Sequence, residues 1–241
     1  GFDYMTKMFD MADNSHEFID FSASAPTNRE SLLPLYEAKH VHLYDHRWAT
    51  STADSSDAVL CSAEQKADPR FEIDTRYWMP ADRVDGRLSS KSWDHEWLMG
   101  WRDITNATNE RTAIASVLPR AAVAHTLRIA FVKGAPSLIA AFLGNISSIP
   151  FDYVCRQKLG GTHLTVEVLK QLPTLPPSRY SKTDLDFIVP RVLALTYTAN
   201  DMKGWAKHLG FDGDPFKFEP ISRMRLRAEL DAYYARLYGL T

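Results

Sequence analysis

The segment from residue 151 to residue 177 constrains the fold of this chain more than any other stretch of its sequence. A short apolar run leads into a basic turn, a pair of glycines and a proline-rich exit. Glycine has no Cβ, so the backbone at Gly160-Gly161 can approach a partner more closely than other residues allow. The polar side chains around the pair are Arg156, Lys158, Thr162 and His163. Such a ring of donors is typical of a protein that holds a phosphate backbone, and it is unsuited to a hydrophobic core.

Alternating apolar and polar residues predict strands in the first half of the chain. Residues 39–44 alternate in the period-two manner of a half-exposed strand, with one apolar face and one face of histidines. Residues 112–118 and 121–132 indicate two more strands, separated by Pro119-Arg120. The intervening residues 49–70 are rich in Ser, Ala and Asp, which predicts a surface loop. A turn is expected at Asp85-Gly86.

Helical periodicity follows in the second half. We expect an apolar helix from residue 137, because Pro136 suits a first helical turn. A short helix from Phe151 would then carry the basic residues to the glycine pair. Apolar positions recur at helical spacing in residues 185–195 and 226–237, with a middle helix near 202–209 that ends at a turn.

These patterns predict an α+β fold with a mixed β-sheet, flanking helices and a helical C-terminal part. The chain has 241 residues, 45% of them hydrophobic, and can therefore bury one large core or two smaller ones. We expect an irregular or helical arm over residues 1–30, a central domain over 31–177 and a helical region over 178–241. The last region would serve for packing or as a spacer.

Three of the six tryptophans, Trp93, Trp97 and Trp101, recur at four-residue spacing. This spacing would line one face of a helix, or it would bracket a loop that tucks into the core. A core role is the first interpretation, and stacking on nucleic-acid bases is the second.

The segment from residue 102 to residue 111 is almost wholly polar. Arginine pairs with guanine and asparagine with adenine in the major groove, because each side chain offers two groups at the matching separation. The residues that could read bases or hold DNA here are Arg102, Asn106, Asn109 and Arg111, with Arg120 further on. The alternative is a connection shaped by Asx turns, which Asn and Thr also favour.

The net charge of −2 argues against a nucleic-acid binder, since such modules are usually basic. Its distribution changes the argument. Residues 111–170 hold seven Lys or Arg and two acids, a net charge of +5, which leaves −7 for the remainder. Charge segregated in this way can give a basic face on an acidic molecule, although it can also arise by chance on a solvated surface.

The glycine segment also resembles a known family. Arg156-Gln-Lys-Leu-Gly-Gly-Thr-His-Leu-Thr165, followed by Leu169-Lys-Gln-Leu-Pro173, is similar to the C-terminal part of type IIG restriction-modification DNA methyltransferases, which methylate adenine at N6. Three other stretches resemble the same family: Leu33 to Arg47, Trp101 to Ile104, and Arg111 to Arg120. The resemblance as a whole covers roughly residues 31 to 238, which is most of the chain.

This resemblance implies that residues 31–177 are a target-recognition (specificity) domain, which selects the double-stranded DNA sequence to be methylated. Two features depart from the family pattern. The chain has Leu143-Gly144-Asn145 where a Leu-Asn pair is expected, and its net charge is negative. The resemblance assigns DNA contacts first to the glycine motif, at Arg156, Lys158, Gly160, Gly161, Thr162 and His163. Weaker candidates are Lys39, His40, His42 and Arg47.

The catalytic signature of the same enzymes is absent from the sequence. N6-adenine methyltransferases hold the flipped base with an Asn-Pro-Pro-Tyr or Asp-Pro-Pro-Tyr motif, whereas the one Pro-Pro pair here follows Leu175 and precedes Ser178. The chain also opens at Gly1 with a polar leader. We therefore expect no enzyme activity and no cofactor in this fragment. The methyltransferase domain, with its S-adenosylmethionine, would lie upstream in the same polypeptide, which could also cleave DNA.

Composition indicates the compartment. The longest apolar stretch, near residues 138–143, is far shorter than the ~20 residues that cross a bilayer, and no secretion signal is evident. Cys61 and Cys155 lack the close spacing of a zinc site and are expected to be free thiols in a reducing compartment. We expect a cytoplasmic protein that does not associate with membranes.

Other functions receive weaker support. His40, His42, Asp45 and His46 have a spacing that could hold a metal, but they also suit a polar strand face. No nucleophile elbow and no phosphate-binding loop are present. The main alternative to DNA recognition is a protein-interaction domain that docks a partner subunit of a phage-defence complex. An independent metal hydrolase is a third possibility.

Overall fold

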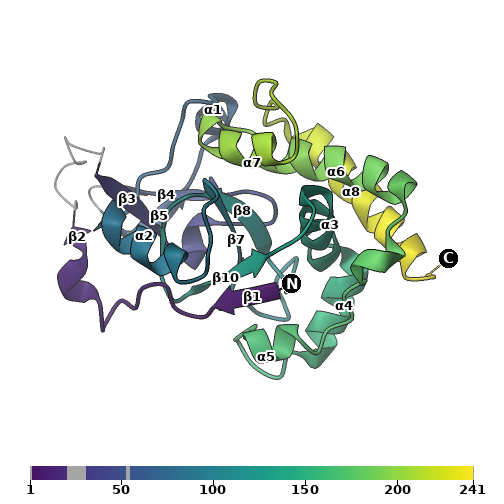
Figure 1. Cartoon of the computed structure of the whole chain (residues 1–241), viewed down its shortest axis with the longest axis horizontal. Coiled ribbons are helices and arrows are strands. Elements are labelled where there is room, and N and C mark those ends of the chain that lie inside the picture. The colour runs from purple at the N-terminus through teal and green to yellow at the C-terminus, as the bar shows by residue number, and fades with distance from the viewer. Residues whose placement is uncertain (1, 21–30, 53–54, 241) are drawn as a thin grey trace.

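The computed structural model describes residues 2–20, 31–52 and 55–240, and it has the α+β architecture expected from the sequence (Figure 1). Strands occupy the left and centre of the view in Figure 1, and the C-terminal helices cover the right side. One hydrophobic core of buried residues runs from the N-terminal strand to the last helix.

A four-stranded antiparallel sheet lies at the centre of the fold. Its strand order is β1 (Phe2–Met5), β10 (Leu127–Val132), β7 (Trp97–Arg102) and β8 (Ala115–Pro119). Strands β7 and β10 are buried along nearly their whole length, which explains why their sequences are so apolar. The arm predicted as irregular therefore supplies an edge strand of this sheet, because β1 pairs with β10.

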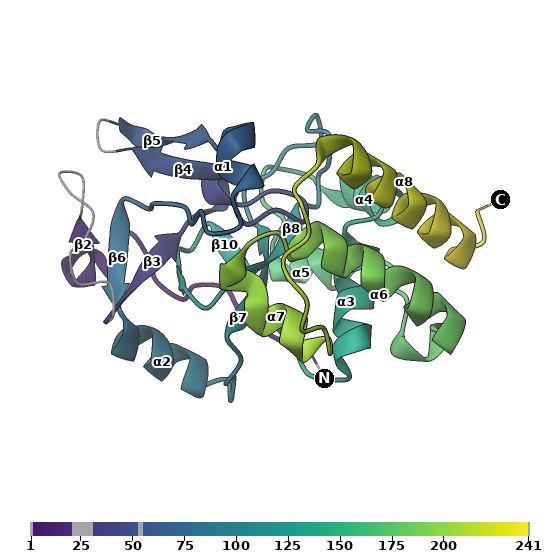
Figure 2. The same cartoon turned by 90° about the horizontal axis from the view of Figure 1, so that it is seen from above.

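A second sheet has the order β2 (Ile19–Asp20), β6 (Tyr77–Pro80), β3 (Leu32–Tyr36) and β9 (Ala122–Val123). Its β3–β9 pair is parallel and its other pairs are antiparallel, so the sheet is mixed, as expected. Helix α2 (Ala81–Ser89) packs against β3 and β6. Figure 2 shows the hairpin of β4 (Ala49–Thr52) and β5 (Ser55–Leu60) on the other side of these strands.

The helices of the second half begin close to where their sequence signals place them. Pro136 starts α3 (Pro136–Ile146), and α4 (Ile149–Lys158) follows after a break of two residues. The next two are α5 (Val166–Leu169) and α6 (Lys182–Thr196), and Ser181 and Asp184 form a capping box at the start of α6. After α7 (Lys203–His208), the Glu219 side chain caps α8 (Pro220–Leu237).

Helix α6 packs on α3, and α8 packs on α4 and α6. The predicted division of the chain at residue 177 remains a prediction. Short 3-10 helices connect the larger elements at Ser15–Glu17, Ala38–His40, Pro177–Arg179 and Asn200–Met202.

Several local predictions failed. Residues 121–132 form two strands, β9 and β10, in different sheets and not the single strand expected. Residues 39–44 do not form a strand, because the 3-10 helix Ala38–His40 turns the chain and buries the histidine at its end. Residues 49–70 are no loop: they form the β4–β5 hairpin and helix α1 (Ala63–Ala67). The Asp85-Gly86 pair lies inside α2 and makes no turn.

The tryptophan cluster confirms the core interpretation and excludes base stacking. Trp93, Trp97 and Trp101 are all buried, on β7 and the loop before it, so their spacing reflects no helix. Trp93 Nε1 donates to the Trp97 carbonyl oxygen at 2.8 Å. Trp101 Nε1 donates to the Leu164 carbonyl oxygen at 2.8 Å, which attaches the segment after α4 to the central sheet.

Among the described residues no single helix is long and apolar enough to cross a bilayer. Only the consecutive helices α3 and α4 reach that length and composition together, and they meet at an angle of 56°.

Candidate nucleic-acid interface

Two polar segments lie side by side at one end of the central sheet. The first, residues 104–110, begins two residues after the end of β7, and the second, residues 158–163, begins at the last residue of α4. Most of their residues are exposed to solvent. We call these two segments together the polar corner.

Backbone hydrogen bonds hold the two segments of the polar corner together. Ile104 and His163 form an isolated antiparallel bridge. The Thr105 amide donates to the Thr162 carbonyl oxygen at 2.9 Å, and the Leu164 amide donates to the Asp103 carbonyl oxygen at 2.7 Å. Residues about sixty positions apart in sequence therefore form one rigid surface.

Arg156 attaches the first of these segments, residues 104–110, to helix α4. Its Nη2 donates to the carbonyl oxygens of Asn109 at 2.9 Å and Glu110 at 3.3 Å, and to Asp152 Oδ2 at 3.2 Å. The buried Asp152 also accepts from the amides of Thr112 and Ala113 at 2.7 Å each. The Arg156 guanidinium, predicted as a DNA donor, thus already serves as an internal brace that shapes the corner.

His163 projects from the corner and is anchored at one ring nitrogen. Its side chain is 56% exposed, and its Nδ1 lies 2.7 Å from Oδ2 of Asp103, which is 4% exposed. Arg128 Nη2 lies 2.9 Å from the same oxygen. Burial by itself would raise the pKa of Asp103, but the hydrogen bonds from Arg128 and His163 outweigh it and lower that pKa.

An ionised Asp103 can only accept hydrogen bonds, so His163 Nδ1 is the donor and Nε2 is left toward solvent. Sequence reasoning placed Arg128 among residues that could face DNA and did not foresee that Arg128 and Asp103 anchor His163. No local signal marks them, because their role depends on a contact between strands and a distant turn.

The glycine pair is exposed, and the backbone conformation there does not require glycine. Neither glycine has a positive φ, and a Cβ added at Gly160 or Gly161 would meet no atom within 4 Å. Within the described part of the chain their amide groups make no hydrogen bond. The glycines therefore leave two backbone donors uncovered. Lys158 beside them is exposed and has no carboxylate partner among the described residues.

The loop of residues 104–110 combines an Asx turn with free side chains. Asn106 Oδ1 accepts from the Thr108 amide at 3.0 Å and from the Thr108 hydroxyl at 3.1 Å. These bonds form an Asx turn, as the alternative interpretation of this segment predicted. The exposed Asn109 side chain makes no hydrogen bond within the described residues. Ile104 is 51% exposed where the two segments meet, and no pattern in the sequence predicts this exposure.

Two of the weaker candidates are buried and cannot contact a duplex. Arg47 is completely buried and donates to the carbonyl oxygens of four residues: Lys66, Asp68, Phe71 and Thr198. His40 is also completely buried, with its Nδ1 accepting from the Glu37 amide at 3.0 Å. Burial lowers the pKa of His40 to about 3.

His42 and Lys39, the other two of these candidates, already contact side chains of the protein itself. The His42 ring stacks on Trp48 at 4.2 Å between centroids, and burial lowers the pKa of His42 to about 4. Lys39 Nζ lies 2.9 Å from Glu37 Oε1.

The residues considered as metal ligands bind other side chains, since His46 bonds Asp201 and Asp45 bonds Lys66. In the described ranges no three His, Cys, Asp or Glu side chains are grouped to hold a metal ion.

The remaining arginines lie outside the polar corner. Arg102 is half-buried, and its Nε donates to the Val41 carbonyl oxygen at 2.7 Å. Arg111 Nη2 lies 3.0 Å from Asp231. Arg120 pairs with Asp85 and lies beyond Pro119, at the far end of β8. Five residue steps along the strand separate that end from the corner, a distance of about 17 Å.

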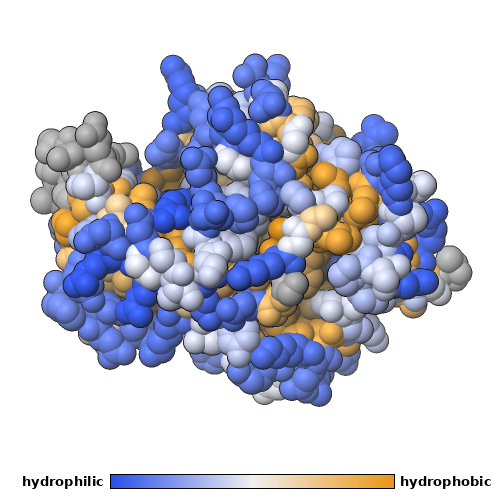
Figure 3. All heavy atoms as spheres, viewed as in Figure 1, coloured by the Kyte–Doolittle hydropathy of each residue, from blue (hydrophilic) through white to orange (hydrophobic). Residues whose placement is uncertain are grey.

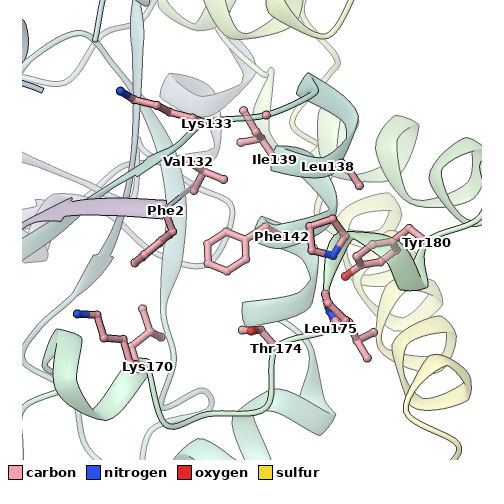
Figure 4. A pocket seen from close by; sticks show the side chains of 14 residues that line it. Phe2, Val132, Lys133, Leu138, Ile139, Phe142, Lys170, Thr174, Leu175 and Tyr180 are labelled. Carbon is pink, nitrogen blue, oxygen red and sulfur yellow. The ribbon is translucent and has the colours of Figure 1, made fainter. Parts of the chain in front are cut away.

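A cavity of about 530 Å³ lies between β10, α3 and the segment before α6, and its lining is mostly apolar (Figure 4). Phe2, Phe142 and Leu175 line it, with the Phe2 and Phe142 rings in edge contact at 5.8 Å between centroids, whereas the amino groups of Lys133 and Lys170 point away from it. Lys170 Nζ lies instead 4.3 Å from the Tyr4 ring centroid. Figure 3 shows apolar surface on this side of the molecule, between α3 and α5. The cavity therefore presents little chemistry for reading a polar ligand.

Comparisons with protein-family models, with curated proteins and with solved structures found no match to this chain.

Proposed function

We propose that this chain recognises double-stranded DNA in a sequence-specific manner, as the target-recognition domain of an adenine-N6 DNA methyltransferase from a restriction-modification or phage-defence system. The four sequence segments that resemble this family support the proposal. The observation that carries it is the polar corner, where the glycine motif and the polar loop after β7 meet as one exposed surface. The catalytic domain and its S-adenosylmethionine would belong to the parent protein.

The corner offers donors of the two kinds that a DNA reader needs. Lys158 and the uncovered amides of Gly160 and Gly161 suit phosphate oxygens, which fix the register of a protein on the duplex. Asn109 and His163 Nε2 suit base edges, and Ile104 suits a thymine methyl group.

Charge at the corner agrees with this role in spite of the net charge of −2. The nearby carboxylates of Asp103 and Asp152 are buried and bonded to arginine, and Glu110 bonds Arg227. Lys158 is thus the one cation of the corner without a carboxylate partner in the described residues. Few phosphate contacts predict weak binding by this chain alone and a salt slope corresponding to about one to three released counterions.

The experiment is a fluorescence-anisotropy titration of labelled duplexes at several salt concentrations. We expect Lys158→Ala to weaken binding to all sequences alike and to reduce the salt slope by about one, because one phosphate contact is lost. Asn109→Ala should instead change which duplex is preferred. The matched control is Lys203→Ala, an exposed lysine at the start of α7, which should change neither quantity.

Two results would contradict the proposal: no duplex binding at low salt, or equal losses for the Lys158 and Lys203 variants. Absence of duplex binding together with tight binding to a protein would favour the alternative, a domain that docks a partner subunit.

A further inference from the structure

Ile104 and His163 lie opposite each other where the two segments of the polar corner meet. The Thr105 and Leu164 amides make the two backbone hydrogen bonds of this bridge, one on each side of the pair. Ile104 and His163 are therefore a non-hydrogen-bonded pair, in which opposite side chains share one face and lie closest together, with about 4.5–5.5 Å between Cβ atoms. Both side chains reach solvent, since Ile104 is 51% exposed and the His163 side chain 56% exposed.

The His163 ring is held so that one nitrogen is left to meet a partner. Its Nδ1 donates to Asp103 Oδ2 at 2.7 Å. The Asp103 backbone is itself fixed, because its amide donates to the Thr126 carbonyl oxygen at 3.0 Å and its carbonyl oxygen accepts from the Leu164 amide at 2.7 Å. A ring flipped by half a turn would place a carbon beside the buried carboxylate and lose that hydrogen bond. The neutral ring therefore presents the lone pair of Nε2, which is an acceptor.

One base pair carries the complementary groups. In the major groove adenine presents its N6 amine as a donor and thymine presents its C5-methyl group, so the edge of an A·T pair offers both. A G·C pair has an amine on cytosine but no methyl group. We infer that Ile104 and His163 together read an A·T base pair, with His163 Nε2 accepting from adenine N6 and Ile104 packing on the thymine methyl group. This inference rests on the proposed DNA recognition and names the base pair that the corner selects.

The rest of the polar corner can hold the duplex while this pair reads it. Lys158 and the amides of Gly160 and Gly161 lie in the turn directly before His163 and suit phosphate oxygens. These groups can only donate, so they cannot accept from a base amine. The acceptor at His163 therefore supplies a base contact that the phosphate donors of the same turn cannot make.

The test begins with the duplex that the chain prefers, selected from a randomised library. Each adenine of that duplex is then replaced in turn by purine, which lacks the N6 amine, and each thymine by uracil, which lacks the methyl group. Fluorescence anisotropy is measured at pH 8, which favours the neutral imidazole. We expect one A·T pair at which either replacement weakens binding about fivefold, the loss that corresponds to one neutral hydrogen bond or one buried methyl group.

Variants of the chain assign the two contacts. His163→Ala should remove the penalty for purine and keep the penalty for uracil, whereas Ile104→Ala should do the reverse. The matched controls are His16→Ala and Ile221→Ala, which should keep both penalties because these exposed residues lie outside the corner. All four variants should keep the circular dichroism of the parent chain, since each side chain is more than half exposed. The base replacements test the inference on the parent chain even if a variant does not fold.

The outcomes separate this inference from the proposed function. Selective duplex binding without an A·T pair that is sensitive to both replacements would overturn the inference and leave DNA recognition standing. The same holds if the folded His163→Ala chain retains the penalty for purine, or if the two penalties fall on different base pairs. Duplex binding without sequence preference, or no duplex binding, would overturn both.

Discussion

His40 shows how packing changes the chemistry of a single side chain. Its imidazole lies in the core between the Glu37 amide and the Ser51 hydroxyl. Burial penalises the charged ring and lowers the pKa of His40 to about 3, whereas an unfolded histidine titrates near 6.5. The ring is therefore neutral in the folded chain at any ordinary pH, and it fills space instead of binding an anion.

The depressed pKa predicts a pH dependence of stability. Below about pH 6.5 the His40 imidazole binds a proton in the unfolded chain, whereas in the folded chain it binds one only near pH 3. The contribution of His40 to stability is therefore complete above about pH 6.5, and it decreases as the pH falls toward 3. The free energy of unfolding should fall by about 2 kcal/mol for this residue between about pH 7.5 and pH 5. Urea titrations followed by tryptophan fluorescence at several pH values would measure it.

His40→Asn keeps an acceptor near the position of Nδ1 but cannot titrate, so the variant should have a flatter dependence on pH. His16→Asn is the control, because the His16 side chain is 75% exposed, and the slope should remain that of the parent chain. Equal slopes for parent and His40→Asn chains would show that the buried imidazole is not responsible.

At the scale of the elements, two helical glycines have opposite surroundings. A Cβ at Gly144 in α3 would lie 2.9 Å from the Tyr234 hydroxyl oxygen and 3.1 Å from the same ring of α8. Gly86 in α2 faces open space, with no atom within 4 Å of such a Cβ. Close packing of α3 against Tyr234 therefore requires glycine at residue 144, whereas α2 has no such requirement.

Paired alanine substitutions test this difference. Gly144→Ala should destabilise the protein by about 1–3 kcal/mol, because it pushes the buried Tyr234 ring from its hydrogen bond with the Ala141 carbonyl oxygen. Gly86→Ala should stabilise it by up to about 1 kcal/mol through helix propensity. Thermal unfolding would separate the two, with Tm shifts of about 2–4 °C per kcal/mol in opposite directions. A stabilising Gly144→Ala would show that α3 and α8 do not pack in this way.

For the whole molecule, Arg47 connects segments that are far apart in sequence. Its guanidinium donates to carbonyl oxygens at residues 66, 68 and 71 and to Thr198 at the end of α6. Both Nη groups are thus satisfied inside the protein, by backbone oxygens that would otherwise be buried without partners, whereas the Nε has no hydrogen-bond partner among the described residues.

Replacing Arg47 by Lys should therefore destabilise the entire fold. A lysine ammonium keeps the charge but cannot span four carbonyl groups with the planar fork of arginine. We expect a loss of about 3–5 kcal/mol in urea unfolding. Arg70→Lys is the control: that side chain is 81% exposed and pairs with Asp68, so its change should stay within about 0.5 kcal/mol. A small effect at Arg47 would mean that its carbonyl partners find water instead.

Much of the second half of the fold could be predicted from the sequence. Pro136 predicts the start of α3, and the periodicity of residues 185–195 and 226–237 predicts α6 and α8. The turn expected after the middle helix lies at Gly210, whose φ is 78°. These signals are local, because caps, turns and helical repeats depend on neighbours within a few residues. The α+β class follows from them.

The candidate site was predictable only in part. The glycine motif and the polar loop were recognised as polar turns, and both are exposed. Their contact through Ile104 and His163, the bracing by Arg156 and the anchoring by Asp103 could not be seen. Each of these contacts depends on the end of β7 lying beside the end of α4, which follows it by about sixty residues in the sequence.

The amino-acid sequence by itself determined the long helices of the second half and the polar character of the segments that line the corner, because these follow from short-range interactions. Only the tertiary structure decided that Arg47 and His40 are buried and that the Ser-rich residues after Thr50 form a hairpin. The physical reason is that a polar group can be buried only where hydrogen-bond partners from distant parts of the chain reach it, and a pattern of neighbouring residues does not predict those contacts.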